Sequence, residues 1–312
     1  MGVQGHVKLI SVINARIVRV LLASLIAALS AAPPAHAQSK RTMTPEELSR
    51  LTLGTPEQQR KAFPPHKIIG NIHYVGTETQ AAFLITTSAG HILVNTNFEA
   101  TVPLLREAME KLGFRFADIK IVLGSHAHGD HMEGDALVKE LTSARVMAME
   151  QDVPALERMR PGGKPHPIDR VLHDGDEVSL GGTTLVAHLT AGHTAGDTTW
   201  TMRAEEGGRS YSVVILGGMG VTQGQALATA AGLTPLAQAY VRSFTFLRSI
   251  PCDVPLGSHA SMYNMAEKHA RLGKEPKGPN PFIDREGYLE ELDARERVFN
   301  IRLDEQKKAA GK

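Results

Sequence analysis

The sequence has a single cysteine, Cys252, among its 312 residues. An internal disulfide is therefore excluded, and the fold has to be stabilised by its hydrophobic core. Residues 250–254 around Cys252 are mostly apolar, so we expect this thiol to be a buried small residue rather than a nucleophile. With 42% hydrophobic and 21% charged residues, the chain is typical of a globular protein and unlike a disordered, collagen-like or coiled-coil one.

The chain also lacks an excess of charge of either sign. It has 34 Lys and Arg residues against 33 Asp and Glu residues. Three of the basic residues, Lys8, Arg16 and Arg19, lie within residues 1–37, so residues 38–312 have 31 basic and 33 acidic residues and a net charge of −2. A nucleic-acid-binding protein needs a concentrated basic surface, so we expect no nucleic-acid partner.

The N-terminal apolar run is too short to cross a bilayer. It covers residues 20–32, which is 13 residues, whereas a membrane-spanning helix needs about 20. Basic residues precede the run and Ala35-His36-Ala37 follows it, an order typical of a secretory signal peptide. We expect cleavage near Ala37, a periplasmic protein and no stable membrane anchor afterwards. An uncleaved anchor is the alternative.

Strands and helices alternate through the rest of the chain. Residues 38–66 are polar and contain several prolines, and we interpret them as a leader packed on the domain that follows, residues 67–312. The patterns predict strands at 68–75, 82–86, 91–94, 119–123, 177–180, 183–189, 200–203 and 212–216. They predict helices at 104–112, from 135, from 235 and from 284. This alternation favours an α/β domain in which helices cover sheets.

Three histidines and an aspartate lie within six residues, at His126, His128, Asp130 and His131. They directly follow the predicted buried strand 119–123, where a loop has rigid support. Imidazole nitrogens and carboxylates are ligands that zinc accepts. Four such groups are too many for one tetrahedral ion that also holds water, so the cluster indicates two metals. A solvated histidine-rich loop is the structural alternative.

Two further histidines are the best additional ligands. His193 follows the predicted strand 183–189, and His259 follows the apolar residues 254–256. Each is flanked by small residues, as a site at one edge of a sheet requires. A lone histidine is usually structural, so both assignments depend on the cluster at residues 126–131.

At these residues the chain resembles the metallo-β-lactamase superfamily, and within it the subclass B3 metallo-β-lactamases. The His-x-His-x-Asp-His motif at residues 126–131 indicates the superfamily alone. Residues 189–194, 198–202 and 257–260 are characteristic of the subclass. The resemblance implies the αββα sandwich of the metallo-β-lactamase fold, with the site on one edge between two sheets.

The resemblance also implies two zinc ions per chain and a role for each ligand. His126, His128 and His193 match the three-histidine zinc site, and Asp130, His131 and His259 match the second site, with Asp130 also acting in catalysis by orienting the attacking water. The implied activity is a zinc hydrolase that opens the β-lactam ring of penicillins, cephalosporins and carbapenems by attack of a zinc-bound hydroxide. The expected partner is therefore a small molecule.

Gly218 falls where other branches of the superfamily carry a metal ligand. Thioester hydrolases and lactonases have an aspartate there, and two lactamase subclasses have a cysteine, so Gly218 argues against those branches. The B3 pattern itself commonly has serines where Gly218 and Gly220 stand, which puts anchoring of the substrate carboxylate in doubt. From this pattern we expect Gly218→Ser to keep the metals and to improve the KM for a carboxylate-bearing lactam.

One more departure concerns the strand that ends at residue 94. An aspartate common in the superfamily is Asn95 here, and a neutral amide is expected to support the metal loop less well. Two alternatives to a β-lactamase therefore stay open. One is a hydrolase of the same fold that acts on another ester, lactone or phosphodiester. The other is a zinc-binding protein without catalytic activity.

Overall fold

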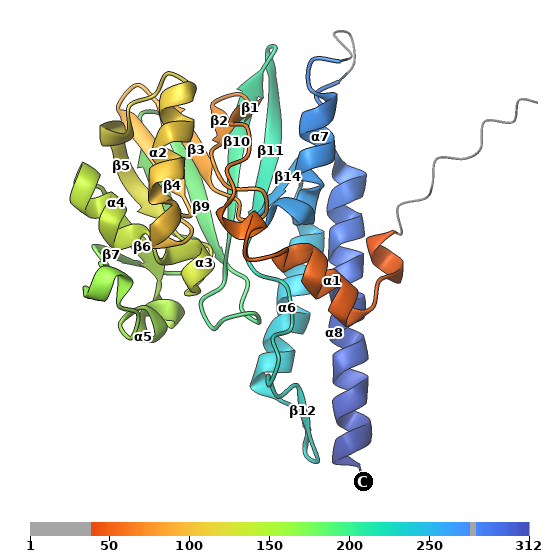
Figure 1. Ribbon diagram of the computed structural model, residues 1–312. Coiled ribbons are helices and arrows are strands. Elements are labelled where there is room, and N and C mark those ends of the chain that lie inside the picture. Colours follow the sequence, from red (N-terminus) through yellow and green to blue (C-terminus); the bar gives the residue numbers. More distant parts are fainter. Residues whose placement is uncertain (1–38, 275–278, 312) are drawn as a thin grey trace, which may run out of the picture. The chain divides into compact units, whose positions relative to one another are not determined.

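The computed structural model describes residues 39–274 and 279–311. The predicted signal peptide, residues 1–37, lies outside these ranges. Seven strands form the first sheet, in the order β1-β2-β3-β4-β5-β6-β7 (Figure 1). Neighbours from β1 to β4 are antiparallel, and β5, β6 and β7 continue the sheet in parallel. The bounds are β1 (His66–Ile69), β2 (Ile72–Tyr74), β3 (Phe83–Thr87), β4 (Gly90–Val94), β5 (Ile119–Leu123), β6 (Arg145–Met149) and β7 (Arg170–Leu172).

Five strands form the second sheet, in the order β14-β11-β10-β9-β8. All its pairs are antiparallel except β11 with β14. The bounds are β8 (Glu177–Leu180), β9 (Thr183–Leu189), β10 (Thr198–Glu206), β11 (Arg209–Leu216) and β14 (Val254–Gly257). A separate small hairpin pairs β12 (Ala228–Thr229) with β13 (Gly232–Leu233).

Helices cover the outer faces of both sheets (Figure 1). Helix α4 contacts β5 and β6 of the first sheet, and the long helix α8 contacts β14 of the second. The helices are α1 (Pro45–Leu53), α2 (Val102–Lys111), α3 (Gly129–Met132), α4 (Asp135–Thr142), α5 (Val153–Leu156), α6 (Pro235–Ser249), α7 (Met265–Arg271) and α8 (Arg285–Ala310). Short 3-10 helices lie at Lys40–Thr42, Gln58–Arg60, Glu99–Thr101, Phe116–Asp118, Glu150–Asp152, Pro161–Gly163 and Ala260–Tyr263. This is the αββα sandwich expected from the sequence.

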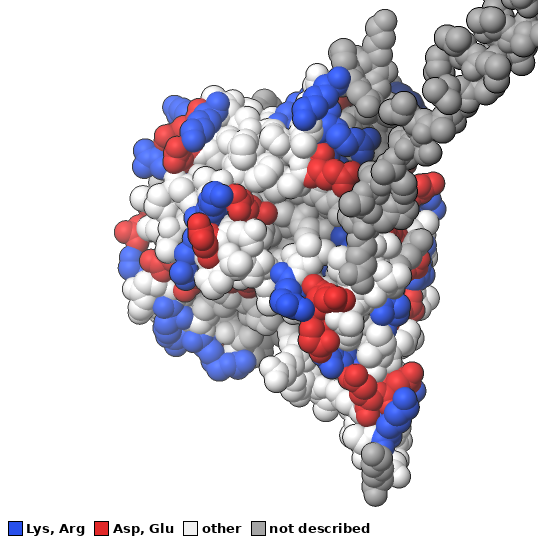
Figure 2. All heavy atoms as spheres, turned by 45° about the vertical axis from the view of Figure 1, so that its right-hand side comes forward, with Lys and Arg blue, Asp and Glu red and all other residues white. Residues whose placement is uncertain are grey.

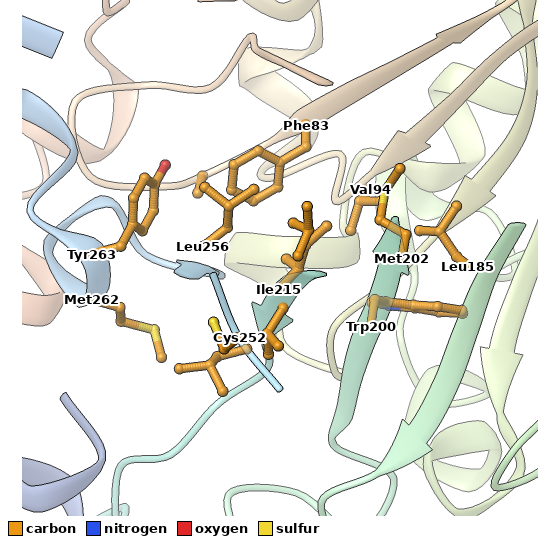
Figure 3. Close-up of a cluster of buried hydrophobic side chains, with 14 of the residues drawn as sticks. Phe83, Val94, Leu185, Trp200, Met202, Ile215, Cys252, Leu256, Met262 and Tyr263 are labelled. Carbon is orange, nitrogen blue, oxygen red and sulfur yellow. The ribbon is translucent and has the colours of Figure 1, made fainter. Parts of the chain in front are cut away.

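Both faces of the first sheet are buried, as its continuous apolar strands predict. Along β3, Phe83 and Ile85 point into the core between the sheets, and Leu84 points to the core beneath α2. Figure 3 shows the core between the sheets, where Phe83 and Val94 of the first sheet lie near Trp200 and Leu256 of the second. Side chains therefore alternate between two cores, with the strand period of two.

Cys252 is part of the core between the sheets (Figure 3). Its side chain is buried, and burial raises the pKa of the thiol to about 12. The expectation that Cys252 is a buried apolar residue is confirmed.

The predicted strand 68–75 was wrong in one respect, because two strands occupy this segment. Gly70 has φ +54°, a left-handed conformation that turns the chain between β1 and β2. The polar leader also contains a helix that the sequence analysis missed. Thr44 caps α1, with a capping box to Glu47, and Leu48 packs on Ala294 and Val298 of α8.

Charges of both signs are interspersed on the face shown in Figure 2, as the balanced composition indicates. Among residues 39–274 and 279–311, none of the helices combines the length and the apolar character that a membrane span requires.

Candidate metal centre

The six predicted ligands come from three loops, each directly after a strand. His126, His128, Asp130 and His131 follow β5, the first of them buried at 2% exposure. His193 follows β9, and His259 follows β14. The loops of the two sheets meet at one edge of the sandwich, so residues as far apart in sequence as Asp130 and His259 become neighbours.

His126, His128 and His193 form the first ligand group, which we call the three-histidine cluster. One ligand atom from each lies within 4.8 Å of the other two. Nε2 of His193 lies 3.2 Å from Nδ1 of His128, and Nε2 of His126 is buried with no hydrogen-bond partner among the described residues. Buried polar atoms normally have partners. Three imidazole nitrogens that converge on one point, one of them buried and unsatisfied, fit a metal ion.

Asp130, His131 and His259 form the second group, the aspartate cluster, with ligand atoms again within 4.8 Å. Oδ2 of Asp130 lies 3.3 Å from Nε2 of His131 and 3.8 Å from Nε2 of His259. Within residues 39–274 and 279–311, neither ring nitrogen of His131 has a hydrogen-bond partner. The donor set of one carboxylate and two imidazoles fits a second metal ion.

The protonation states of both clusters suit metal binding. Burial lowers the pKa of His193 to about 4 and takes those of His126 and His259 well below the usual value, so these imidazoles are neutral at pH 7. Burial alone would raise the pKa of Asp130, but the neighbouring histidines outweigh it, and the pKa is lowered. Neutral imidazoles and an ionised carboxylate are the forms that ligate metals.

Asn95, at the end of β4, supports the metal loop directly. Its Oδ1 accepts a hydrogen bond from the Ser125 amide at 2.9 Å, and its Nδ2 donates to the Ala81 carbonyl at 3.3 Å. Its φ of +65° is one that asparagine tolerates. An ionised aspartate could not donate to Ala81, so the amide makes a bond here that the carboxylate would lose.

Asp152 joins two ligand loops, and the sequence analysis missed it. This buried carboxylate accepts hydrogen bonds from the Ala127 amide at 2.8 Å, the Gly196 amide at 2.7 Å and the Thr194 hydroxyl at 2.9 Å. Ala127 lies between two ligands, and Thr194 follows a third. No local pattern marks Asp152, because it follows β6, a strand that the sequence analysis did not predict.

Asp197 is a second buried carboxylate that the sequence analysis left out. Its Oδ2 lies 3.5 Å from Nδ1 of His126 and accepts a hydrogen bond from the Gly218 amide at 2.6 Å. Burial raises its pKa well above the usual value, and Asp152 adds to the shift. The residue stands four positions after His193, between the segments 189–194 and 198–202 that are typical of the subclass, which is the signal that could have drawn attention to it.

Gly218 and Gly220 differ in the space around them. A Cβ on Gly218 would lie 2.2 Å from Cδ2 of His193, a distance that real side chains do not adopt. This contact argues against the expectation that Gly218→Ser keeps the metals, because the serine would push against the ring of His193. A Cβ on Gly220 would meet only Nη1 of Arg295, at 3.8 Å.

Gly220 also orients a ligand through its backbone. Its carbonyl accepts hydrogen bonds from Nδ1 of His193 at 2.6 Å and from the Tyr240 hydroxyl at 2.8 Å. The proton on Nδ1 leaves Nε2 of His193 free to ligate, which is the usual role of a second hydrogen bond on a metal-binding histidine.

Both clusters open into a cleft of about 1190 Å³. His128, Asp130, His193 and His259 lie along it, together with α1, the loop at residues 218–225 and the part of α8 from Arg295 to Gln306. The leader thus forms one wall of the candidate active site. A cleft of this size accommodates a drug-sized molecule.

Comparisons with known proteins define the class. Residues 75–259 match the family model described as the metallo-beta-lactamase superfamily, and the chain belongs to this superfamily. The FEZ-1 metallo-beta-lactamase from Legionella gormanii is 40% identical and superposes with a TM-score of 0.75, covering 80% of this chain and 98% of that one. BJP-1, a subclass B3 metallo-beta-lactamase of Bradyrhizobium japonicum, is 32% identical with a TM-score of 0.72, over 81% of this chain and 98% of that one.

These neighbours confirm the assignment near subclass B3 and identify the chain as a metal-binding hydrolase of the superfamily. One curated relative is named for an activity other than that of these β-lactamases. The hydroxyacylglutathione hydrolase of Cereibacter sphaeroides is 33% identical over 95 residues, which is 30% of this chain. The match spans about a third of that relative's length, at 34%.

Proposed function

We propose that this protein is a zinc-dependent β-lactamase that opens the lactam ring of penicillins, cephalosporins and carbapenems. The three-histidine cluster beside the aspartate cluster carries the proposal, because it provides two metal sites at one cleft. Similarity to subclass B3 enzymes over nearly their whole length supports it.

The two clusters would each hold one zinc ion. His126, His128 and His193 would bind the first ion, and Asp130, His131 and His259 the second. Bound zinc supplies a water of pKa about 7 and a Lewis acid for the substrate carbonyl.

The chain's own residues position the reactants. The Asp130 side chain is 17% exposed, so it reaches the cleft as well as its cluster. As an ionised carboxylate it would accept a hydrogen bond from the attacking water and so orient it. Asp152, Asn95 and Gly220 hold the loops that carry the ligands, so little rearrangement is needed when the substrate binds.

A second candidate is a hydrolase of the same fold that acts on another ester, lactone or phosphodiester. The hydroxyacylglutathione hydrolase relatives favour it. Gly218 argues against it, because the bridging aspartate of thioester hydrolases is missing and has no room beside His193.

The proposal includes the location and partners expected from the sequence. The protein would be exported by its N-terminal segment and would act in the periplasm on a small molecule, without a nucleic-acid partner.

Ligand substitutions test the proposal. His128→Ala or His259→Ala is expected to lower β-lactam hydrolysis on the order of a thousandfold and bound zinc below two per chain, because each removes one of three ligands at a site. His173→Ala is the matched control, since His173 is exposed and outside both clusters. Full activity in either ligand variant would contradict the proposal.

A further inference from the structure

Arg295 of α8 lines the same cleft as the metal ligands, although it is only 5% exposed. Its Nη1 lies 3.8 Å from the position of a Cβ on Gly220, and the Gly220 carbonyl binds Nδ1 of His193. One backbone residue therefore separates this guanidinium from the three-histidine cluster.

Two of the three guanidinium nitrogens are engaged by the protein. Nε donates to Oε1 of Glu291 at 2.8 Å, and Nη2 donates to the Thr52 hydroxyl at 2.8 Å. Nη1 donates to none of the residues that the structure describes. Because the guanidinium is planar and held at two points, Nη1 presents its hydrogens in a fixed direction.

The charge of Arg295 is only partly neutralised. Glu291 is shared with Lys40, whose Nζ lies 2.9 Å from Oε2, so two cations share one buried carboxylate. Arg302, further along α8 in the same cleft, is paired with both Glu46 and Glu305. A buried positive charge without a full counter-charge favours an anionic ligand.

We propose that Arg295 binds the carboxylate of the substrate and so selects for anionic substrates. The inference rests on the proposed function, because it places a carboxylate-bearing lactam in this cleft. In this proposal Arg295 takes the role of the serines that the B3 pattern commonly has where Gly218 and Gly220 stand here. Gly220 has a specific part in it, since a Cβ there would lie 3.8 Å from Nη1, in van der Waals contact with the guanidinium.

The test uses binding, so that it does not depend on turnover. The zinc-loaded protein is titrated by calorimetry with mercaptocarboxylic acids of two to four carbons and with their methyl esters. The thiolate binds zinc, and only the acids offer an anion to Arg295. The wild type is expected to bind at least one acid roughly 10- to 100-fold more tightly than its ester, the usual effect of a charge-assisted hydrogen bond.

Arg295→Met is expected to bring this acid-to-ester ratio close to one. Arg302→Met is the matched control, from the same helix and cleft, and should keep the ratio because Arg302 is already paired. Arg295→Lys keeps a cation beside Glu291 and loses the planar fork. Arg295→Lys should fold, bind two zinc ions and lower the acid-to-ester affinity ratio. This variant therefore tests the proposal even if Arg295→Met does not fold.

The proposal is overturned if the wild type shows no preference for any acid, or if both Arg295 variants keep it. A parallel measurement of kcat/KM for a cephalosporin and its methyl ester separates this proposal from the proposed function. If the acid is preferred to its ester through Arg295 but no lactam is hydrolysed, only the β-lactamase assignment is contradicted. If lactams are hydrolysed but the Arg295 variants leave the acid-to-ester preference unchanged, only the proposed role of Arg295 is contradicted.

Discussion

His193 is constrained on both sides of its ring. Gly220 accepts the Nδ1 proton, and Gly218 lies against the ring carbons. We therefore predict that Gly218→Ser displaces the ring and weakens metal binding at the three-histidine cluster by at least about tenfold. The measurement is zinc affinity by competition with a chromophoric chelator.

Gly220→Ser is the control for this prediction, because its Cβ has open space except for Arg295. It should keep two zinc ions per chain. Equal zinc affinity in the Gly218 and Gly220 variants would show that the contact with His193 does not constrain the ligand.

His66 is a residue whose ionisation affects stability away from the metal centre. Its ring stacks on Tyr74 and Phe282, and Nε2 is buried with no hydrogen-bond partner in the described part of the chain. Burial lowers its pKa to about 4. Between pH 6.5 and 4 the unfolded chain binds a proton here that the folded chain does not, so stability falls as the pH falls through this window.

His66→Phe keeps an aromatic ring and removes the titration. We predict that acidification from pH 7 to pH 4.5 destabilises the wild type by about 1–3 kcal/mol more than the variant. Urea unfolding at both pH values, with EDTA present to remove metal, measures the difference. The same loss of stability in both proteins would contradict the assignment.

At the scale of elements, Asp152 connects the end of β6 to the loops after β5 and β9. It accepts three hydrogen bonds from the two loops. Asp152→Ala leaves those donors without their acceptor, so we expect a loss of about 2–4 kcal/mol in unfolding free energy and a 10- to 100-fold loss in zinc affinity.

Asp118→Ala is a suitable comparison, because Asp118 forms a surface ion pair with Arg115. Such pairs contribute at most about 1 kcal/mol. If Asp152→Ala bound zinc as tightly as Asp118→Ala, the two loops would not depend on the carboxylate.

The elements could be predicted where the local pattern alone decides them. The strands at 119–123, 177–180 and 183–189 have the predicted bounds, because continuous or alternating apolar residues end at clear turns. Helix α1 was missed because its amphipathic face is short and its packing partner, α8, is more than 230 residues away. Strands β6 and β7 were also missed, and Asp152 lies between them in the sequence.

The candidate site likewise has residues that the local sequence pattern predicts and residues that only tertiary contacts identify. The six ligands were predictable because four are adjacent in sequence and two follow strands, and the structure brings all six together. Asp152 and Arg295 contact the site only through tertiary structure. No spacing in the sequence relates residue 295 to residue 220, so the serines missing at residues 218 and 220 could be identified from the sequence, and the anchor that we propose at Arg295 could not.

At the scale of the whole described chain, the sandwich places the ligand loops of both sheets at one edge and covers that edge with α1 and α8 (Figure 1). The sheets supply rigid supports for the metal ligands. The leader and the C-terminal helix α8 supply walls of the cleft, and Arg295 of α8 donates a hydrogen bond to the Thr52 hydroxyl of α1. The two proposals therefore assign metal binding and substrate selection to different elements, and they predict that each can be changed separately.

The central claim is that the two clusters hold zinc ions that open a β-lactam ring. The most direct measurement is hydrolysis of a carbapenem and a cephalosporin by purified residues 38–312, with added zinc and with EDTA. The account predicts cleavage with zinc and its loss with the chelator. A folded protein with two bound zinc ions that cleaves neither lactam would contradict it.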